Sequence, residues 1–170
     1  TGDAMNLSDL YNRLKALFPL GELTEQRPAL AFITLPAEFL RPTLRHLRDR
    51  EGFTHLVLLT AVDWIEVHSE NYFGEGDWIE EGWFQLTYLL SNRTQACDIG
   101  LRVMIDRPAS GLATMDSIDD VWPTAATYQR ELREMFGIDF PGSPRIEEEF
   151  ILEGWNDIPP YRRDFDTLKY

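Results

Sequence analysis

Three carboxylates are the side chains whose type and spacing most readily suggest catalysis. Glu131 and Glu134 stand three residues apart, which places both on one face of a helix, and Asp63 follows an apolar run. A small free-standing acidic enzyme could use such acids if one carboxyl were held protonated and another ionised. That alternative predicts a concave pocket around the three residues with shifted pKa values. A simpler interpretation is a surface ion pair, because Arg130 lies four residues before Glu134.

The sequence gives little support for a metal site or a nucleotide-binding site. No two of the three histidines, His46, His55 and His68, stand three or four residues apart on one helix face. Neither a G-x-G-x-x-G nor a G-x-x-x-x-G-K-[ST] loop follows a strand. Cys97 is the single cysteine, which excludes an internal disulfide and an iron–sulfur cluster held by cysteines of this chain alone. The acidic neighbour Asp98 disfavours a reactive thiolate at Cys97.

Composition narrows the class of protein and of partner. The chain has 170 residues, of which 44% are hydrophobic, enough for one domain with a real core. None of its apolar runs approaches the roughly 18 residues of a membrane helix. A net charge of −13 repels nucleic acid and anionic lipid. The charge fits either an ordinary soluble acidic protein or a subunit that meets a basic partner.

The elements that must position these residues can be read from hydrophobic periodicity. Apolar residues recur at helical spacing over 7–18, 40–47 and 124–136, and Gly137 stands where a helix C-cap glycine belongs. Apolar or alternating runs predict strands over 30–35, 55–64, 84–90 and 99–105. A polar stretch over 66–82 is expected to be a long hairpin connection. The predicted fold class over residues 1–140 is therefore α+β, a two-layer domain with a mainly antiparallel sheet packed on helices.

Residues 141–170 have a different composition. They contain four prolines, an acidic run over 147–149 and no clear period, and such long structureless segments are uncommon in compact domains. Disordered tails are usually poor in large apolar residues. This segment keeps Phe150, Ile151, Leu152, Trp155, Ile158, Tyr161 and Phe165. We therefore expect an extended C-terminal arm of the same domain, and we favour a partner's surface over the chain's own domain as its resting place.

One long motif carries a family resemblance. Residues 122–142 read W-P-T-A-A-T-Y-Q-R-E-L-R-E-M-F-G-I-D-F-P-G. They resemble the signature of the C-type (30 kDa-type) peripheral-arm subunits of respiratory complex I, roughly W-P-[AS]-A-x-W-x-E-R-E-x-x-D-x-F-G-I-x-F-x-G. Residues 60–64 (T-A-V-D-W) and 84–90 are similar to two strands of that family. Residues 160–165 (P-Y-R-R-D-F) are similar to its P-L-R-K-D-F close.

The sequence also departs from that pattern. Gln129 replaces the first glutamate of the E-R-E motif, and Glu134 stands where the family usually has aspartate. Ser143 replaces a frequent histidine after the glycine matched by Gly142. Residues 145–149 (R-I-E-E-E) replace a basic L-R-R-I-L run, a reversal of charge that implies a changed partner surface.

The resemblance implies a role rather than a reaction. Such subunits are accessory structural parts of the peripheral arm of proton-translocating NADH:quinone oxidoreductase and brace its quinone-reducing module. NADH, flavin, iron–sulfur clusters and quinone belong to partner subunits, and this chain is expected to bind no cofactor and no metal and to have no catalytic residue of its own. The implied partners are the large quinone-site subunit and the iron–sulfur subunits. The implied location is peripheral, on the cytoplasmic side of the membrane, and a membrane-bound nickel–iron hydrogenase-type complex is the alternative.

The expected contact surface combines the signature helix with the C-terminal arm. We hypothesise that Arg130 and Glu131, together with the charges of 162–164, form ion pairs that hold the arm and a neighbouring subunit. The alternative is that these charges pair only within the domain. The full set of interface candidates is Arg130, Glu131, Glu134, Phe136, Gly137, Phe140, Trp155, Arg162, Arg163, Asp164 and Phe165.

Overall fold

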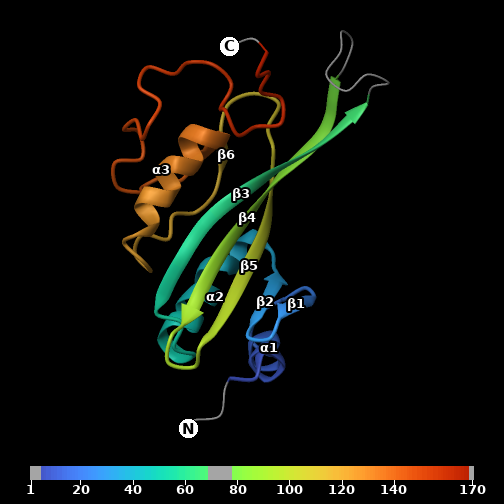
Figure 1. Ribbon diagram of the computed structural model, residues 1–170, viewed down its shortest axis with the longest axis vertical. Helices are drawn as coiled ribbons and strands as arrows, with labels where there is room; N and C mark the ends of the chain where they lie inside the picture. Colours follow the sequence, from blue (N-terminus) through green and yellow to red (C-terminus); the bar gives the residue numbers. More distant parts are fainter. Residues whose placement is uncertain (1–4, 69–77, 169–170) are drawn as a thin grey trace.

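A twisted five-stranded sheet with three helices forms the body of the protein, as the computed structural model in Figure 1 shows. The structure describes residues 5–68 and 78–168. In chain order the elements are α1 (Leu7–Lys15), β1 (Leu23–Arg27), β2 (Leu30–Thr34), the 3-10 turn η1 (Ala37–Phe39), α2 (Leu40–Arg50), β3 (His55–His68), β4 (Trp78–Asn92), β5 (Cys97–Asp106), β6 (Ala113–Thr114), α3 (Ala125–Phe136) and β7 (Ile138–Asp139).

The sheet has the order β1-β2-β5-β4-β3, and its pairing is mainly antiparallel, as predicted. One central pair differs, because β2 runs parallel to β5. The chain reaches β5 from β2 through α2 and the β3–β4 hairpin, and so the two strands can point the same way. β1 was missed because its sequence, L-T-E-Q-R, is polar and lies at an edge, where four of five residues are exposed. The short parallel pair of β6 and β7 was also missed.

The predicted loop over 66–82 is partly wrong. β3 continues to His68 and β4 begins at Trp78, and the two remain paired to that point. The last pair between β4 and β5 is Trp83 with Asp106, so β3 and β4 extend beyond it as a two-stranded ribbon. Residues 69–77, the middle of the predicted connection, lie outside the described residues. Polar composition misled the prediction, because both faces of such a ribbon can face solvent.

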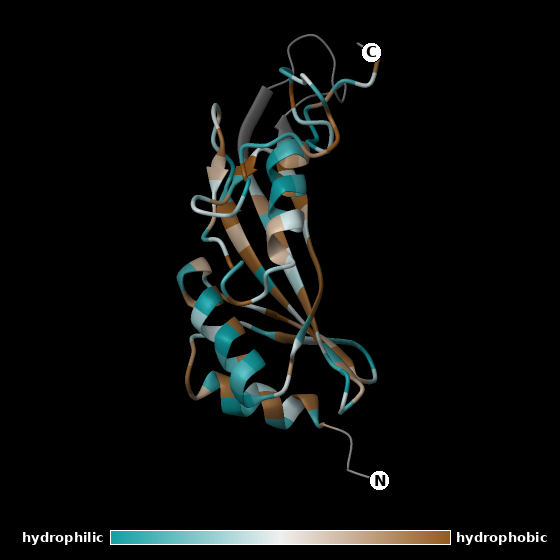
Figure 2. Ribbon diagram, turned by 90° about the vertical axis from the view of Figure 1, so that its left-hand side faces the viewer, coloured by the Kyte–Doolittle hydropathy of each residue, from teal (hydrophilic) through white to brown (hydrophobic). Residues whose placement is uncertain are grey.

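The three predicted helices are confirmed, with small changes at their ends. Asn6 caps α1 by accepting hydrogen bonds from the backbone N–H groups of Ser8 and Asp9 at 2.9 and 3.3 Å. Figure 1 places α1 and α2 at one end of the sheet and α3 at the other, beside β3. Figure 2 shows hydrophobic stretches along the strands and mixed hydrophobic and hydrophilic turns in the helices, as expected of helices that cover one face of a sheet.

The two faces of the sheet differ in burial. On β4 the inward side chains Phe84, Leu86, Tyr88 and Leu90 are at most 1% exposed, as their alternation predicted. The outward face is partly open, with Val62, Trp64 and Met104 between 43% and 48% exposed. Within the part of the chain that the structure describes, no helix is long and apolar enough to span a bilayer.

After β7 the chain has neither helix nor strand up to Leu168, in agreement with the expected absence of regular structure. The segment 141–168, here the C-terminal segment, folds back over α3 and then reaches the end of the sheet (Figure 1). It thus packs on its own domain, the resting place that the sequence disfavoured. A further contact with a partner stays a prediction.

Candidate functional site

The signature motif forms α3 and its two flanking turns. Leu132, Met135 and Phe136 are buried under the sheet face, and Gly137 ends the helix in the left-handed conformation with φ of 76°. That conformation disfavours any side chain, which explains the glycine. The hydroxyl of Tyr128 donates to the carbonyl of Val57 at 2.9 Å and holds α3 against β3. α3 is therefore a fixed platform for the residues around it.

Two charged residues of α3 hold the C-terminal segment by its backbone. The carboxylate of Glu134 accepts hydrogen bonds from the N–H groups of Phe150 and Ile151, each at 2.8 Å. Arg130, one turn earlier, donates to the carbonyl of Glu149 at 2.6 Å and lies 5.7 Å from the centre of the Phe150 ring. Charged groups bound to backbone amides act as bracing, because they satisfy polar groups of a segment that lacks secondary structure.

A buried group of four charged residues joins the end of this segment to the sheet. Arg107, directly after β5, places Nε 2.8 Å from Oδ1 of Asp63 and Nη2 2.9 Å from Oδ1 of Asp164. Arg162 makes two 2.9 Å hydrogen bonds to the same Asp164, and the N–H of Arg163 donates to Oδ2 of Asp63 at 2.9 Å. We call Asp63, Arg107, Arg162 and Asp164 the charged clamp.

The clamp is deeply buried at its centre. The side chains of Asp63 and Arg107 are 0% and 4% exposed. The N–H groups of Arg107 do not point squarely at the carboxylate oxygens, so these close approaches are ion pairs rather than well-aligned hydrogen bonds. The guanidinium also lies 5.8 Å from the Phe84 ring, and its stem passes Gly82, where a Cβ would come within 3.0 Å of it.

The pKa of Asp164 reflects its surroundings in the clamp. Partial burial favours its neutral form, but the hydrogen bond from Arg162 and the charges of Arg107 and Arg162 outweigh that effect. The pKa of Asp164 is therefore held below its ordinary value. Protonation of Asp164 in acid would weaken the attachment of the C-terminal segment.

A second, uncharged cluster holds the start of the same segment. Gln129 is fully buried on α3, where its Oε1 accepts from the N–H of Ile118 at 2.9 Å. Its Nε2 donates to the hydroxyls of Ser117 at 2.8 Å and Ser143 at 2.6 Å. We call Gln129, Ser117 and Ser143 the neutral junction. Gln129 and Ser143 are the two positions where the sequence departs from glutamate and histidine of the family pattern, and they touch each other.

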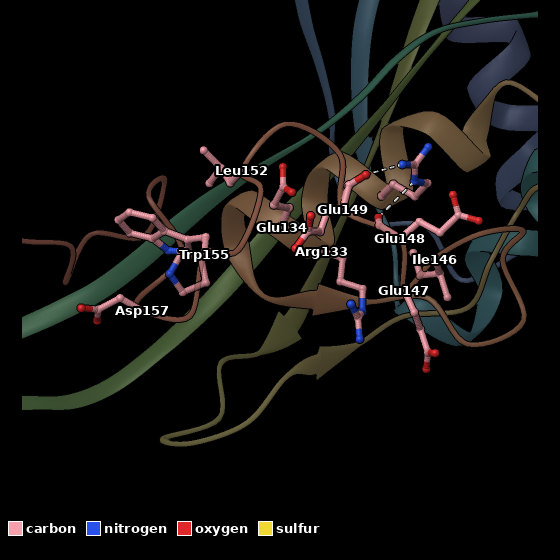
Figure 3. Close-up of a pocket in the computed structure, with 11 residues that line it drawn as sticks. Arg133, Glu134, Ile146, Glu147, Glu148, Glu149, Leu152, Trp155 and Asp157 are labelled. Atoms are coloured by element: carbon pink, nitrogen blue, oxygen red, sulfur yellow. Dashed lines mark hydrogen bonds between the residues drawn. The ribbon is translucent and has the colours of Figure 1, made fainter.

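Two grooves flank the C-terminal segment. The first, of about 210 Å³, lies between it and α3, and Figure 3 shows its side chains. It is lined by Arg130, Arg133, Glu134, Ile146, Glu147, Glu148, Glu149, Leu152, Trp155, Asp157 and Pro159. The second, of about 400 Å³, is lined by Ala61, Val62, Asp63, Trp64, Phe136, Tyr161 and Arg163. We call the second the aromatic groove.

The enzyme alternative loses its geometric basis in this arrangement. Glu134 lines the first groove and Asp63 the aromatic groove, whereas Glu131 lines neither. The carboxylates of Glu134 and Asp63 are engaged by backbone N–H groups and by Arg107. Burial and the charge of Asp98 raise the pKa of the Cys97 thiol, which favours the unreactive thiol form. Among residues 5–68 and 78–168, no cluster of three or more His, Cys, Asp or Glu side chains could hold a metal.

The interface candidates fall into three groups. Phe136 and Phe140, 7% and 0% exposed, belong to the domain's own core, and Gly137 is a helix cap. Arg130, Glu134, Arg162 and Asp164 bind within the domain, the alternative that the sequence had left open. The ring centres of Trp155 and Phe165 lie 6.0 Å apart, and Arg163 is exposed. Contact of any of these residues, or of half-buried Glu131, with a partner stays a prediction.

Sequence reasoning missed the residue that joins the two family motifs. Asp63 belongs to the T-A-V-D-W motif and Asp164 to the P-Y-R-R-D-F motif, and Arg107 lies between them. The sequence offered one weak signal. Arg107 directly follows β5, and β5 pairs with β4, a strand that the family resemblance includes. Spatial proximity of residues a hundred positions apart is a property of the fold.

Comparison with known proteins decides the family. Residues 33–170 match the family model described as respiratory-chain NADH dehydrogenase, 30 Kd subunit. The chain belongs to this family. The signature helix, both strands of the resemblance and the C-terminal segment all fall within the matched range, which begins inside β2.

Relatives in the family are named as parts of one enzyme complex. The NADH-quinone oxidoreductase C subunit of Moorella thermoacetica is 25% identical over 94% of this chain and 95% of its own length. That of Rhodobacter capsulatus is 34% identical over 88% of this chain and 63% of its own length. The NADH-quinone oxidoreductase C/D subunit of Acidiphilium cryptum is 31% identical over 94% of this chain, which spans only 25% of that longer protein.

A solved structure supports the fold. A chain of the membrane-bound sulfane sulfur reductase, an archaeal respiratory membrane complex, superimposes with a TM-score of 0.78. The two chains share 27% sequence identity, and the match covers 96% of this chain and 87% of the other. A subunit of that archaeal respiratory membrane complex therefore has the same mixed sheet packed on helices.

Proposed function

We propose that this protein is a cofactor-free accessory subunit of the peripheral arm of a proton-translocating NADH:quinone oxidoreductase. The observation that carries the proposal is the family match over residues 33–170. A relative of nearly equal length, from Moorella thermoacetica, bears the name of the C subunit of NADH-quinone oxidoreductase. The hydrogenase-type alternative is not favoured, because the relatives from Moorella, Rhodobacter and Acidiphilium all carry the quinone oxidoreductase name.

The physical role that fits the structure is bracing. The charged clamp and the neutral junction hold a long segment without secondary structure in one place on a rigid α+β body. Such a segment can present a shaped surface without a large ordering cost at the moment of binding. Electron transfer, NADH, flavin, iron–sulfur clusters and quinone are assigned to the partner subunits.

The proposed partners are the large quinone-site subunit, the D-type subunit, and the iron–sulfur subunits. The D-type subunit has the stronger support, because relatives in Acidiphilium cryptum and Aquifex aeolicus bear the double name C/D, one chain for both parts. A single chain keeps its two parts at high effective concentration, which favours a direct contact. We place the assembled subunit peripherally on the cytoplasmic side of the membrane.

Affinity purification from the protein's own cells in mild detergent, followed by mass spectrometry, tests this function. Recovery with NADH-binding, iron–sulfur, D-type and antiporter-like membrane subunits is the expected result. Recovery with a nickel-binding large subunit and without an NADH-binding subunit would assign the protein to a hydrogenase-type complex instead. Recovery as a stable monomer without partners would contradict the proposal.

A further inference from the structure

The two edges of the five-stranded sheet are built differently. β1 has five residues, of which four are exposed, and its pairing with β2 is irregular between Glu25 and Arg27. Short, charged and irregular edges prevent pairing with other chains. β3, at the other edge, has 14 residues. Its pairing with β4 is regular from Leu58 to Ile65, between two irregular points.

The regular part of β3 lacks the usual protection of an edge. Its sequence is L-L-T-A-V-D-W-I, and its one charged residue, Asp63, points inward to Arg107. Among the described residues, the backbone of Leu58–Ile65 forms its hydrogen bonds with β4 alone. The hydroxyl of Tyr128 donates a hydrogen bond to the carbonyl of Val57, just before this stretch. A long apolar edge of this kind is a template for another strand.

The aromatic groove lies along this edge. Its lining combines outward side chains of β3, Val62 and Trp64, with Asp63, Phe136 and Tyr161 on the helix-covered side. A cavity lined from both faces of one strand must lie beside the strand's edge. Trp64 and Tyr161 are 48% and 57% exposed, and the Tyr161 ring contacts Phe136 with centres 5.6 Å apart. Exposed Trp and Tyr beside a buried apolar floor are typical of binding hot spots.

The C-terminal segment supplies part of the groove's lining, Tyr161 and Arg163. The N–H of Tyr161 donates to the carbonyl of Met135 at 2.9 Å, which fixes this residue at the end of α3. Asp164, three residues later, is held by Arg107 and Arg162. The charged clamp and this hydrogen bond therefore fix the part of the C-terminal segment that supplies Tyr161 to the groove.

We propose that the β3 edge between Leu58 and Ile65 accepts an extended segment of the D-type subunit as an additional strand. The proposal rests on the proposed function and names the contact that it uses. Unpaired N–H and C=O groups at strand spacing are complementary to another extended backbone. The lack of outward charge along L-L-T-A-V-D-W-I calls for an apolar, β-branched segment, one of whose side chains enters the aromatic groove.

The occupant follows from the relatives and from charge. In the C/D proteins one chain holds both parts, so a D-type segment is always available to this domain. A second copy of this chain is a poorer occupant, because each copy carries a net charge of −13 and two such bodies would repel at close range.

Two matched variants and one exchange measurement test the proposal. Val62→Lys adds a charge at the edge, whereas Met104→Lys adds one at a position of equal exposure, 44% against 43%, on central strand β5. Each tagged full-length variant is co-expressed with the D-type subunit, and the complex is quantified by native mass spectrometry. Hydrogen–deuterium exchange of the unaltered protein, free and in complex, reports on residues 58–65 without any substitution. Equal thermal unfolding midpoints of the two variants establish that both are folded.

The expected result is a loss of affinity of at least roughly tenfold for Val62→Lys and little change for Met104→Lys. Exchange over residues 58–65 slows in the complex. A complex that forms with unchanged exchange in β3 would overturn this inference and leave the proposed function standing. A free protein that dimerises until Val62→Lys separates it would also overturn the inference, with a second copy as occupant. Failure to recover any subunit would contradict the proposed function itself.

Discussion

The C-terminal segment is attached at two places by opposite physical means. The neutral junction holds its start through Gln129 and two serine hydroxyls, and the charged clamp holds its end through Asp63, Arg107, Arg162 and Asp164. The neutral junction and the centre of the clamp, Asp63 and Arg107, are buried, yet the two attachments differ in what happens when one partner is removed. A buried neutral group that loses its hydrogen-bond partner lowers the free energy of unfolding by about the free energy of its desolvation. A buried charge that loses its counter-charge lowers it several times more. The two attachments should therefore respond very differently to similar substitutions.

Asp63→Ala should have the largest effect. It leaves the Arg107 guanidinium, 4% exposed, with Asp164 as its remaining counter-charge among the described residues, and removes the acceptor of the Arg163 N–H. We expect a loss of about 3–5 kcal/mol in the free energy of unfolding, measured by urea denaturation. Asp120→Ala is the matched control, because Asp120 pairs with Arg41 and Arg45 at the surface, and we expect at most about 1 kcal/mol there. Equal losses in the two variants would contradict the assignment of a buried clamp.

A substitution in the neutral junction should lower the free energy of unfolding by less than Asp63→Ala does. Gln129→Leu keeps the volume but removes the acceptor of the Ile118 N–H and the donor to the Ser117 and Ser143 hydroxyls, of which Ser117 keeps its hydrogen bond to Asp119. We expect a loss of about 2 kcal/mol, again from urea denaturation. The family pattern offers a sharper comparison. Gln129→Glu alone should destabilise the protein near neutral pH, and adding Ser143→His should recover part of that loss. A double-mutant cycle without coupling would contradict direct contact between positions 129 and 143.

Gly137→Ala tests the turn that links the two attachments. A Cβ at this position meets nothing closer than 3.5 Å, so space is available, but φ is 76°. We expect a loss of about 1–2 kcal/mol from backbone strain alone. The measurement is the same denaturation series, with Gly142→Ala as a control in open space at φ of 83°. Because both sites carry the same strain, similar losses are expected, and a much larger loss at Gly137 would indicate a packing role.

Acid should weaken the charged clamp and leave the neutral junction unchanged. The folded protein holds the pKa of Asp164 below its ordinary value, so this stabilisation is complete above the unfolded-state pKa, about 4, and is lost as pH falls toward the folded-state pKa. Stability curves of the unaltered protein and of Asp164→Asn should therefore converge in acid. Because Asp164 is partly exposed, we expect this effect to be the smallest of the series. Curves that stay parallel would contradict a depressed pKa at Asp164.

Local patterns were sufficient for most elements. The alternation of Phe84, Leu86, Tyr88 and Leu90 predicted the buried face of β4, and apolar spacing with Gly137 predicted α3 and its end. Such features depend on neighbours within one turn or one strand. β1 was missed for the same reason, since a polar edge strand leaves no local pattern. The candidate site was predicted only in part: Arg130, Glu134, Arg162 and Asp164 were named, but Arg107 and the backbone groups that Arg130 and Glu134 bind were not.

By itself, the sequence determined the α+β class, the helix signature and the irregular C-terminal segment, because periodicity, capping and composition are written in adjacent residues. Only the tertiary structure decided that β2 pairs parallel with β5 and that Gln129 meets Ser143. It also decided that Arg107 joins Asp63 to Asp164 across a hundred positions of the chain. These contacts depend on where the closed fold brings distant segments. Burial then gives such contacts their strength, since the same charges at the surface would be screened by water.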